Sequence, residues 1–184
     1  MAVLLPKLDR GTACVVVVDL QEKLTPVMWN FPSVEKYSRA MILAARELGM
    51  PVLATEQYPR GLGATIASVR EALPAAPMVK MSFSCGADPA FAQALAATGR
   101  KQAVVVGIEA HVCIFQTVRD LLGLGYEVYV CADAVTSRFE EHRRIALEQM
   151  RDMGAVVTSA ETVIFDLLHA AGTPEFKRTS ALVR

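Results

Sequence analysis

The chain has 184 residues, of which 53% are hydrophobic and 21% are charged. This composition suits one compact domain with a sizeable core and excludes a disordered chain. Lysine plus arginine and aspartate plus glutamate each total 19, so no net charge attracts nucleic acid or an anionic membrane surface. We therefore expect a single domain over residues 1–184, with no nucleic acid and no membrane among its partners.

The N-terminal segment and the cysteines are typical of a cytoplasmic protein. Residues 1–10 have no basic segment before their short apolar patch, and no apolar run reaches membrane-spanning length. The four cysteines are widely scattered, which favours neither a zinc site nor a disulfide framework. Cys14 and Cys131 lie in apolar runs and are expected in the core, whereas Cys85 lies in a Ser-Phe-Ser-Cys-Gly loop that could expose it.

Apolar runs rich in β-branched residues alternate with segments of helical periodicity along the chain. Strands are expected over residues 13–19, 51–56, 77–81, 102–107, 126–133 and 155–158. Helices are expected over residues 33–48, from about 64, and over 88–98, 111–124, 140–153 and 162–168. Ser33 is suited to cap the first of these helices. The polar tail, residues 172–184, is expected to become ordered only against a partner subunit.

This alternation predicts the fold class. Because parallel strands need crossover connections, six strands separated by helices predict an α/β protein, a three-layer, doubly wound Rossmann-like fold with a six-stranded parallel sheet. The turn after the first strand reads Asp19-Leu20-Gln21-Glu22, without the glycines that admit a pyrophosphate, and the chain has no P-loop. We therefore expect no nucleotide cofactor.

Three reactive side chains lie at the ends of predicted strands. Asp19 ends the first strand, Lys80 lies in the short third strand, and Cys113 follows the fourth. Parallel strands place their carboxyl ends at one edge, where open α/β sheets bind their ligands. There a carboxylate can take the thiol proton, an ammonium can stabilise both anions, and backbone amides can hold an oxyanion. The start of a helix should also bias Cys113 toward the thiolate.

Each of these residues also has a simpler interpretation. A free cysteine is among the most buried residue types, so Cys113 can be an inert core thiol. Lys80 can be an edge residue whose ammonium reaches water. Trp29, the only tryptophan, can pack under its loop as core rather than form the wall of a site.

The motifs around these residues carry a resemblance to a known family. They are Val-Val-Asp19-Leu-Gln21, Met-Val-Lys80 and Gly107-Ile-Glu-Ala-His-Val-Cys113. On these motifs the chain resembles the isochorismatase-like cysteine hydrolase superfamily over nearly its whole length. With Thr55-Glu56-Gln57-Tyr58-Pro59 it is most similar to the isochorismatase domain-containing protein 2 subgroup.

The resemblance implies a catalytic triad in which Asp19 is the base, Cys113 is the nucleophile, and Lys80 is the charge partner of both. It also implies a cis peptide bond between Ile108 and Glu109, and an oxyanion hole formed by the backbone N–H groups of Glu109 and Cys113. The residues expected to line the substrate pocket are Gln21, Trp29, Glu56, Gln57 and His111.

The chain departs from the superfamily at the metal site. Nicotinamidases of this superfamily bind a divalent metal through an aspartate and histidines after the second strand. The three histidines here are His111, His142 and His169, so that group of ligands is missing. One histidine without nearby partners makes a poor metal site. We expect neither a metal nor any other cofactor.

These features predict a small-molecule hydrolase that cleaves an amide, ureido or related C–N bond through a thioester. One alternative is hydrolysis of a vinyl ether of the isochorismate kind, which needs protonation by Asp19 but no cysteine nucleophile. Another is a non-catalytic interaction protein that retains the fold. We also expect a homo-oligomer, a dimer or tetramer, because relatives in this superfamily are commonly oligomeric and the apolar content is high.

Overall fold

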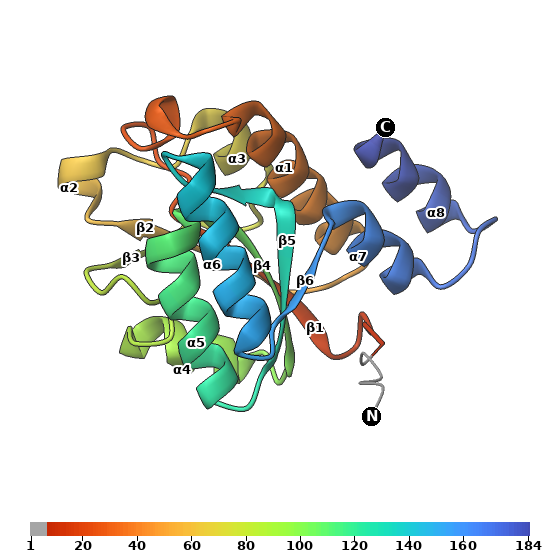
Figure 1. Ribbon diagram of the computed structural model, residues 1–184. Coiled ribbons are helices and arrows are strands. Elements are labelled where there is room, and N and C mark those ends of the chain that lie inside the picture. The colour runs from red at the N-terminus through yellow and green to blue at the C-terminus, as the bar shows by residue number, and fades with distance from the viewer. Residues whose placement is uncertain (1–6) are drawn as a thin grey trace.

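A computed structural model describes residues 7–184 as an α/β fold around one six-stranded sheet (Figure 1). The strand order is β3-β2-β1-β4-β5-β6, and every neighbouring pair is parallel. The predicted α/β fold with six parallel strands is therefore confirmed. The strands are β1 (Ala13–Val18), β2 (Val52–Gln57), β3 (Met78–Lys80), β4 (Gln102–Ile108), β5 (Glu127–Thr136) and β6 (Val156–Thr158).

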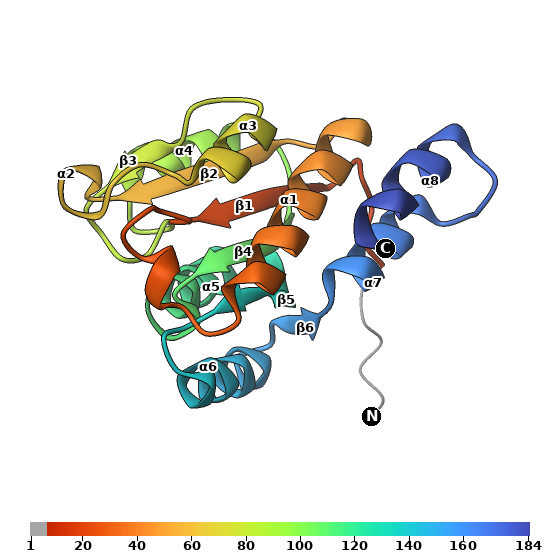
Figure 2. The ribbon, with the colours of Figure 1, turned by 90° about the horizontal axis from the view of Figure 1, so that it is seen from above.

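Helices cover both faces of the sheet (Figures 1 and 2). Alternate residues of β1 divide between two cores, because successive side chains of a strand point to opposite faces. Val15 and Val17 belong to the core under α1 (Phe31–Glu47) and α7 (Ala160–Leu168). Val16 and Val18 belong to the core under α4 (Pro89–Ala97), α5 (Phe115–Gly123) and α6 (Glu140–Asp152). Both central strands, β1 and β4, are buried along their whole length, which explains their continuous apolar sequences.

The helices and helical turns follow the predicted order, with short additions. They are η1 (Thr25–Val27), α1 (Phe31–Glu47), α2 (Pro59–Leu62), α3 (Ala67–Ala72), α4 (Pro89–Ala97), η2 (Ala110–Ile114), α5 (Phe115–Gly123), α6 (Glu140–Asp152), α7 (Ala160–Leu168), α8 (Pro174–Thr179) and η3 (Ser180–Val183). None of the helices within residues 7–184 is long and apolar enough to cross a membrane.

Two helix starts differ from prediction because side chains bind elsewhere. The helix expected from about residue 64 begins at Ala67, since Glu56 accepts hydrogen bonds from both the N–H and the hydroxyl of Thr65. Helix α1 begins at Phe31 rather than at a cap by Ser33. The Ser33 hydroxyl instead donates to the carbonyl of Asp133, and Pro32 occupies the first turn, where a missing N–H costs nothing.

The end of β5 and the C-terminal tail also differ from prediction. Strand β5 continues to Thr136 instead of ending at Asp133, with a register shift opposite Val105–Gly107. The tail forms α8 and η3 and packs against α1 of its own chain, where Arg178 pairs with Glu47. The tail is therefore ordered in the single chain.

The strand order determines where a site can form. From β1 the chain adds β2 and β3 on one side, and from β4 it adds β5 and β6 on the other. The order thus reverses between β1 and β4, and the crevice of such sheets lies at the carboxyl ends of the strands on either side of the reversal. Asp19 directly follows β1, and Cys113 lies five residues beyond the end of β4.

Candidate active site

Asp19 is completely buried at the end of β1 and accepts hydrogen bonds on both carboxylate oxygens. Its backbone turns into the left-handed region, with φ at 52°, a conformation that aspartate tolerates better than most residues. Oδ1 accepts a bond of 2.8 Å from the Thr55 hydroxyl. Oδ2 accepts one of 2.7 Å from the ammonium of Lys80. Both bonds stabilise a negative charge on Asp19, because a carboxylate accepts stronger hydrogen bonds when it is ionised.

Lys80 is also buried, with 1% of its side chain exposed. Besides Asp19, its ammonium donates to Gln57 Oε1 at 2.9 Å, the Phe83 carbonyl at 3.0 Å and the Ser82 carbonyl at 3.2 Å. A buried charge is tolerated only when it is paired and hydrogen-bonded, and this one is both. The interpretation of Lys80 as an edge residue reaching water is therefore wrong.

Cys113 lies in η2, a π-helical turn directly after β4. The Glu109 carbonyl fixes this turn by accepting bonds from the N–H groups of Val112 (3.0 Å) and Ile114 (3.1 Å). The Cys113 side chain is 7% exposed, and its thiol is hydrogen-bonded to the Asp19 carboxylate. The Ile108–Glu109 peptide bond is cis.

The surroundings of Cys113 favour the thiol form in the resting protein. Burial raises the pKa of this thiol most, the Asp19 carboxylate raises it further, and Lys80 lowers it. The expectation that the helix start would bias Cys113 toward the thiolate is therefore wrong. The thiol needs a base to become a nucleophile, and Asp19 is in hydrogen-bond contact with it.

Gly107 allows β4 to approach β1 closely enough for this contact. Its φ is 122°, and a Cβ atom at this position would overlap the backbone nitrogen and carbonyl of Val18. Only glycine fits such a close approach. The glycine therefore lets the ends of β1 and β4 come together, and these ends carry Asp19 and the turn of Cys113.

Of the expected pocket residues Gln21, Glu56 and Gln57, Gln57 binds Lys80 through its side chain, and Gln21 binds the Asp19 carbonyl through its backbone N–H. Thr55 and Gln57 share one face of β2, beside Lys80, and Glu56 points to the other face, where it binds Thr65. The Gln21 amide donates to the carbonyls of Gln57 and Gly63 and accepts from the Gln57 N–H. The Gln21 side chain therefore fixes the end of β2.

The other two expected pocket residues lie beside β5. The Trp29 ring faces the Arg143 guanidinium at 5.6 Å and lines a cavity of about 190 Å³ between α1 and β5. His111 Nδ1 lies 2.9 Å from the Ser137 hydroxyl, and its ring centroid is 4.8 Å from that of His142. Burial lowers the pKa of His111.

Two residues of this site were not expected from the sequence. Thr55 binds Asp19 directly, and the sulfur of Cys85 lies 3.6 Å from the Thr55 hydroxyl. Cys85 is fully buried, so the expectation that its loop could expose it is wrong; its N–H donates to the hydroxyl of Thr117 on α5. A signal for Thr55 existed, because it is the first polar residue after the apolar start of β2, a strand paired with β1.

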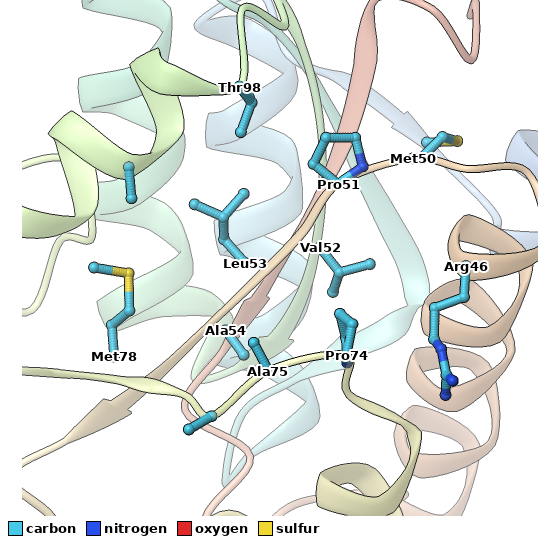
Figure 3. Close-up of a pocket in the computed structure, with 12 residues that line it drawn as sticks. Arg46, Met50, Pro51, Val52, Leu53, Ala54, Pro74, Ala75, Met78 and Thr98 are labelled. Atoms are coloured by element: carbon cyan, nitrogen blue, oxygen red, sulfur yellow. The ribbon is translucent and has the colours of Figure 1, made fainter.

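A separate cavity of about 620 Å³ lies along β2, bounded by α1, α4 and the segment before β3 (Figure 3). It is lined by Arg46, Met50, Pro51, Val52, Leu53, Ala54, Pro74, Ala75, Ala76, Met78, Ala94 and Thr98. These residues all lie in the described part of the chain, and none of them has a carboxylate, thiol or imidazole. Nor do any three His, Cys, Asp or Glu side chains of residues 7–184 gather as ligands for a metal ion.

Known proteins are similar to this chain in sequence and in fold. The isochorismatase domain family matches residues 13–162. Isochorismatase domain-containing protein 2 of Homo sapiens is 37% identical, covering 100% of this chain and 90% of that protein. The secreted isochorismatase effector Isc1 of Phytophthora sojae is 40% identical, covering 91% and 82%. The structure of MAR1 ribonuclease from Caenorhabditis elegans has a TM-score of 0.90 and 37% identity, covering 97% and 92%. The chain therefore belongs to the isochorismatase family and has the hydrolase fold of that family.

Proposed function

We propose that the protein hydrolyses an amide, ureido or related C–N bond of a small molecule through a thioester on Cys113. The observation that carries this proposal is the contact of the Cys113 thiol with the Asp19 carboxylate, whose Oδ2 lies 2.7 Å from the Lys80 ammonium. The base is thus within hydrogen-bond reach both of the nucleophile and of the group that stabilises the base.

In the first half-reaction, the Cys113 sulfur attacks the substrate carbonyl carbon and its proton passes to Asp19. The electron pair of the C=O bond moves to the oxygen, which accepts hydrogen bonds from the backbone N–H groups of Glu109 and Cys113. When the intermediate collapses, the C–N bond breaks and the leaving nitrogen takes the proton from Asp19. The products of this half are an amine or ammonia and a thioester on Cys113.

Water completes the cycle in the second half-reaction. Asp19 takes a proton from the water as its oxygen attacks the thioester carbonyl. The C–S bond then breaks, the acid product leaves, and the sulfur of Cys113 regains a proton from Asp19. Lys80 stabilises the carboxylate each time it is ionised, and its bonds to Gln57, Ser82 and Phe83 keep the ammonium in place.

A screen of small amides and ureides with the purified protein tests this proposal. Cys113→Ala should abolish turnover, whereas Cys131→Ala, a matched substitution of another buried cysteine, should not. Rapid acid quenching followed by mass spectrometry should find the acyl group on the peptide that contains Cys113. Turnover that persists in Cys113→Ala, with no acylated peptide, would overturn the proposal.

The same screen separates the alternatives. An isochorismate-type vinyl ether that is cleaved equally by Cys113→Ala would indicate proton transfer from Asp19 without a covalent step. No turnover on any substrate would favour a non-catalytic interaction protein. RNA belongs in the screen because the C. elegans relative is named a ribonuclease, and a chain without net positive charge should leave it intact.

Three further expectations accompany this function. Turnover should persist in a metal chelator, because the mechanism uses only side-chain and backbone groups. The protein should be a homo-oligomer, a dimer or tetramer, and light scattering at micromolar concentration should give a mass well above 19.9 kDa. We place it in the cytoplasm, and fractionation of the source cells tests that location.

A further inference from the structure

The hydrogen bond between Thr55 and Asp19 has a defined direction. An ionised carboxylate can only accept, so the hydrogen in the 2.8 Å bond belongs to the Thr55 hydroxyl. A hydroxyl has one hydrogen, and this bond uses it. Thr55 can therefore take part in any other hydrogen bond only as an acceptor.

Cys85 supplies the second hydrogen bond. Its sulfur lies 3.6 Å from the Thr55 oxygen, and because the Thr55 hydrogen is already used, the Cys85 S–H must be the donor. The Thr117 hydroxyl fixes the Cys85 backbone by accepting its N–H at 2.9 Å. Burial raises the pKa of Cys85 to about 11, so the hydrogen is present at neutral pH. Thr55 and Cys85 are 1% and 0% exposed, so water is not a competing partner.

We propose that Thr55 is a positioning residue for the base, and that Cys85, Thr55 and Asp19 form a buried donor chain that keeps the Asp19 carboxylate ionised and oriented toward Cys113. The proposal rests on the proposed function of Asp19 as the base. In the described part of the chain, the titratable groups facing Asp19 are Lys80 on β3, Cys113 on η2 and Cys85 before α4. Besides these groups, Thr55 donates a hydrogen bond to Asp19, and Thr55 carries no charge.

The comparison of Thr55→Val with Thr55→Ser tests the chain. Valine keeps the β-branched shape suited to a strand and removes the hydroxyl, whereas serine keeps the hydroxyl. In Thr55→Val, the acidic limb of the kcat/KM profile should move to higher pH by about 1–2 units, as expected for losing a hydrogen bond to a charged group. KM at the pH optimum should stay unchanged. In Thr55→Ser, the acidic limb should lie at the same pH as in the unsubstituted protein.

A readout without turnover keeps this test separate from the proposed function. Carbon-13 NMR of protein labelled at the aspartate carboxyl carbons reports the pH at which Asp19 takes up a proton, with Asp19→Asn assigning the signal. Thr55→Val should raise that pH whether or not a substrate is known. An unmoved NMR midpoint in an active Thr55→Val enzyme would overturn the donor chain and leave the hydrolase proposal standing.

Cys85 provides the second test. Cys85→Ala removes the outer donor and should move the same midpoint in the same direction by less, while Cys85→Ser keeps a donor and should move it little. The infrared S–H band that disappears in Cys85→Ala should shift in Thr55→Val, because the sulfur then loses its acceptor. An S–H band that stays in place would show that Cys85 does not donate to Thr55, and would overturn that link.

Discussion

Two ion pairs of this protein have nearly the same length and opposite surroundings. Lys80 and Asp19 lie 2.7 Å apart with side chains 1% and 0% exposed. Arg144 and Glu141, on α6, lie 2.6 Å apart with side chains 53% and 63% exposed. Arg144 also pairs with Glu148 at 2.6 Å. Distance therefore does not distinguish the buried pair from the surface pair.

Burial gives the two pairs different consequences. Water and salt screen the surface pair, and holding its long side chains in place costs entropy, so such pairs contribute little. The buried pair is screened far less, and both of its charges affect the pKa of the neighbouring Cys113 thiol. The comparison teaches that burial, and not the length of the ion pair, lets the charges of Asp19 and Lys80 act on a neighbouring thiol.

The largest effect is expected when the buried pair is broken. Lys80→Ala leaves the Asp19 carboxylate buried without its cation, which should lower the free energy of unfolding by about 3–5 kcal/mol. Turnover should fall by orders of magnitude while the fold persists. Lys80→Arg should not restore it, because a planar guanidinium cannot replace a compact ammonium among these acceptors. Denaturant unfolding and steady-state assays measure the two effects.

One outcome in the Lys80→Ala variant would contradict that prediction. If Lys80→Ala retains both its stability and its turnover, the triad as assigned here is wrong. Circular dichroism of each variant separates a lost catalytic group from a lost fold.

A smaller effect is expected on the labelling of Cys113. Removing one buried charge should shift the midpoint of labelling in the opposite direction from removing the other. The Asp19 carboxylate raises the pKa of Cys113 and Lys80 lowers it. Removing the carboxylate in Asp19→Asn should therefore move the midpoint of iodoacetamide labelling of Cys113 to lower pH. Lys80→Met, which removes the cation, should move it to higher pH. Mass spectrometry of the labelled peptide across a pH series measures both midpoints.

Midpoints that shift in the same direction would contradict this electrostatic assignment. Cys131 provides an internal reference in the same spectra, because burial and Asp133 are the causes of its raised pKa. Its labelling should not differ between the variants.

The smallest effect is expected at the surface pair. Arg144→Ala removes two ion pairs that water already screens, so thermal unfolding should change little and turnover should not change. The labelling midpoint of Cys113 should also stay where it is. A loss of turnover in Arg144→Ala would mean that burial does not explain the difference between the two pairs.

The sequence was sufficient for the fold class and for placing three candidate reactive residues at the ends of strands. Buried parallel strands need continuous apolar runs, and residues at the ends of such runs fall at one edge of the sheet. Asp19, Lys80 and Cys113 were therefore identifiable before any contact was known. These signals are local, because each depends on a few neighbouring residues.

The tertiary structure added contacts that the sequence did not indicate. Asp19 binds Thr55 across 36 positions, and no local pattern reports such a pairing. The same holds for the burial of Cys85 and for the raised pKa of Cys113. From the place of Cys113 at the start of a helix, the sequence predicted a lowered pKa. Desolvation and charge depend on everything packed around a group, so they become known only when the strands are in place.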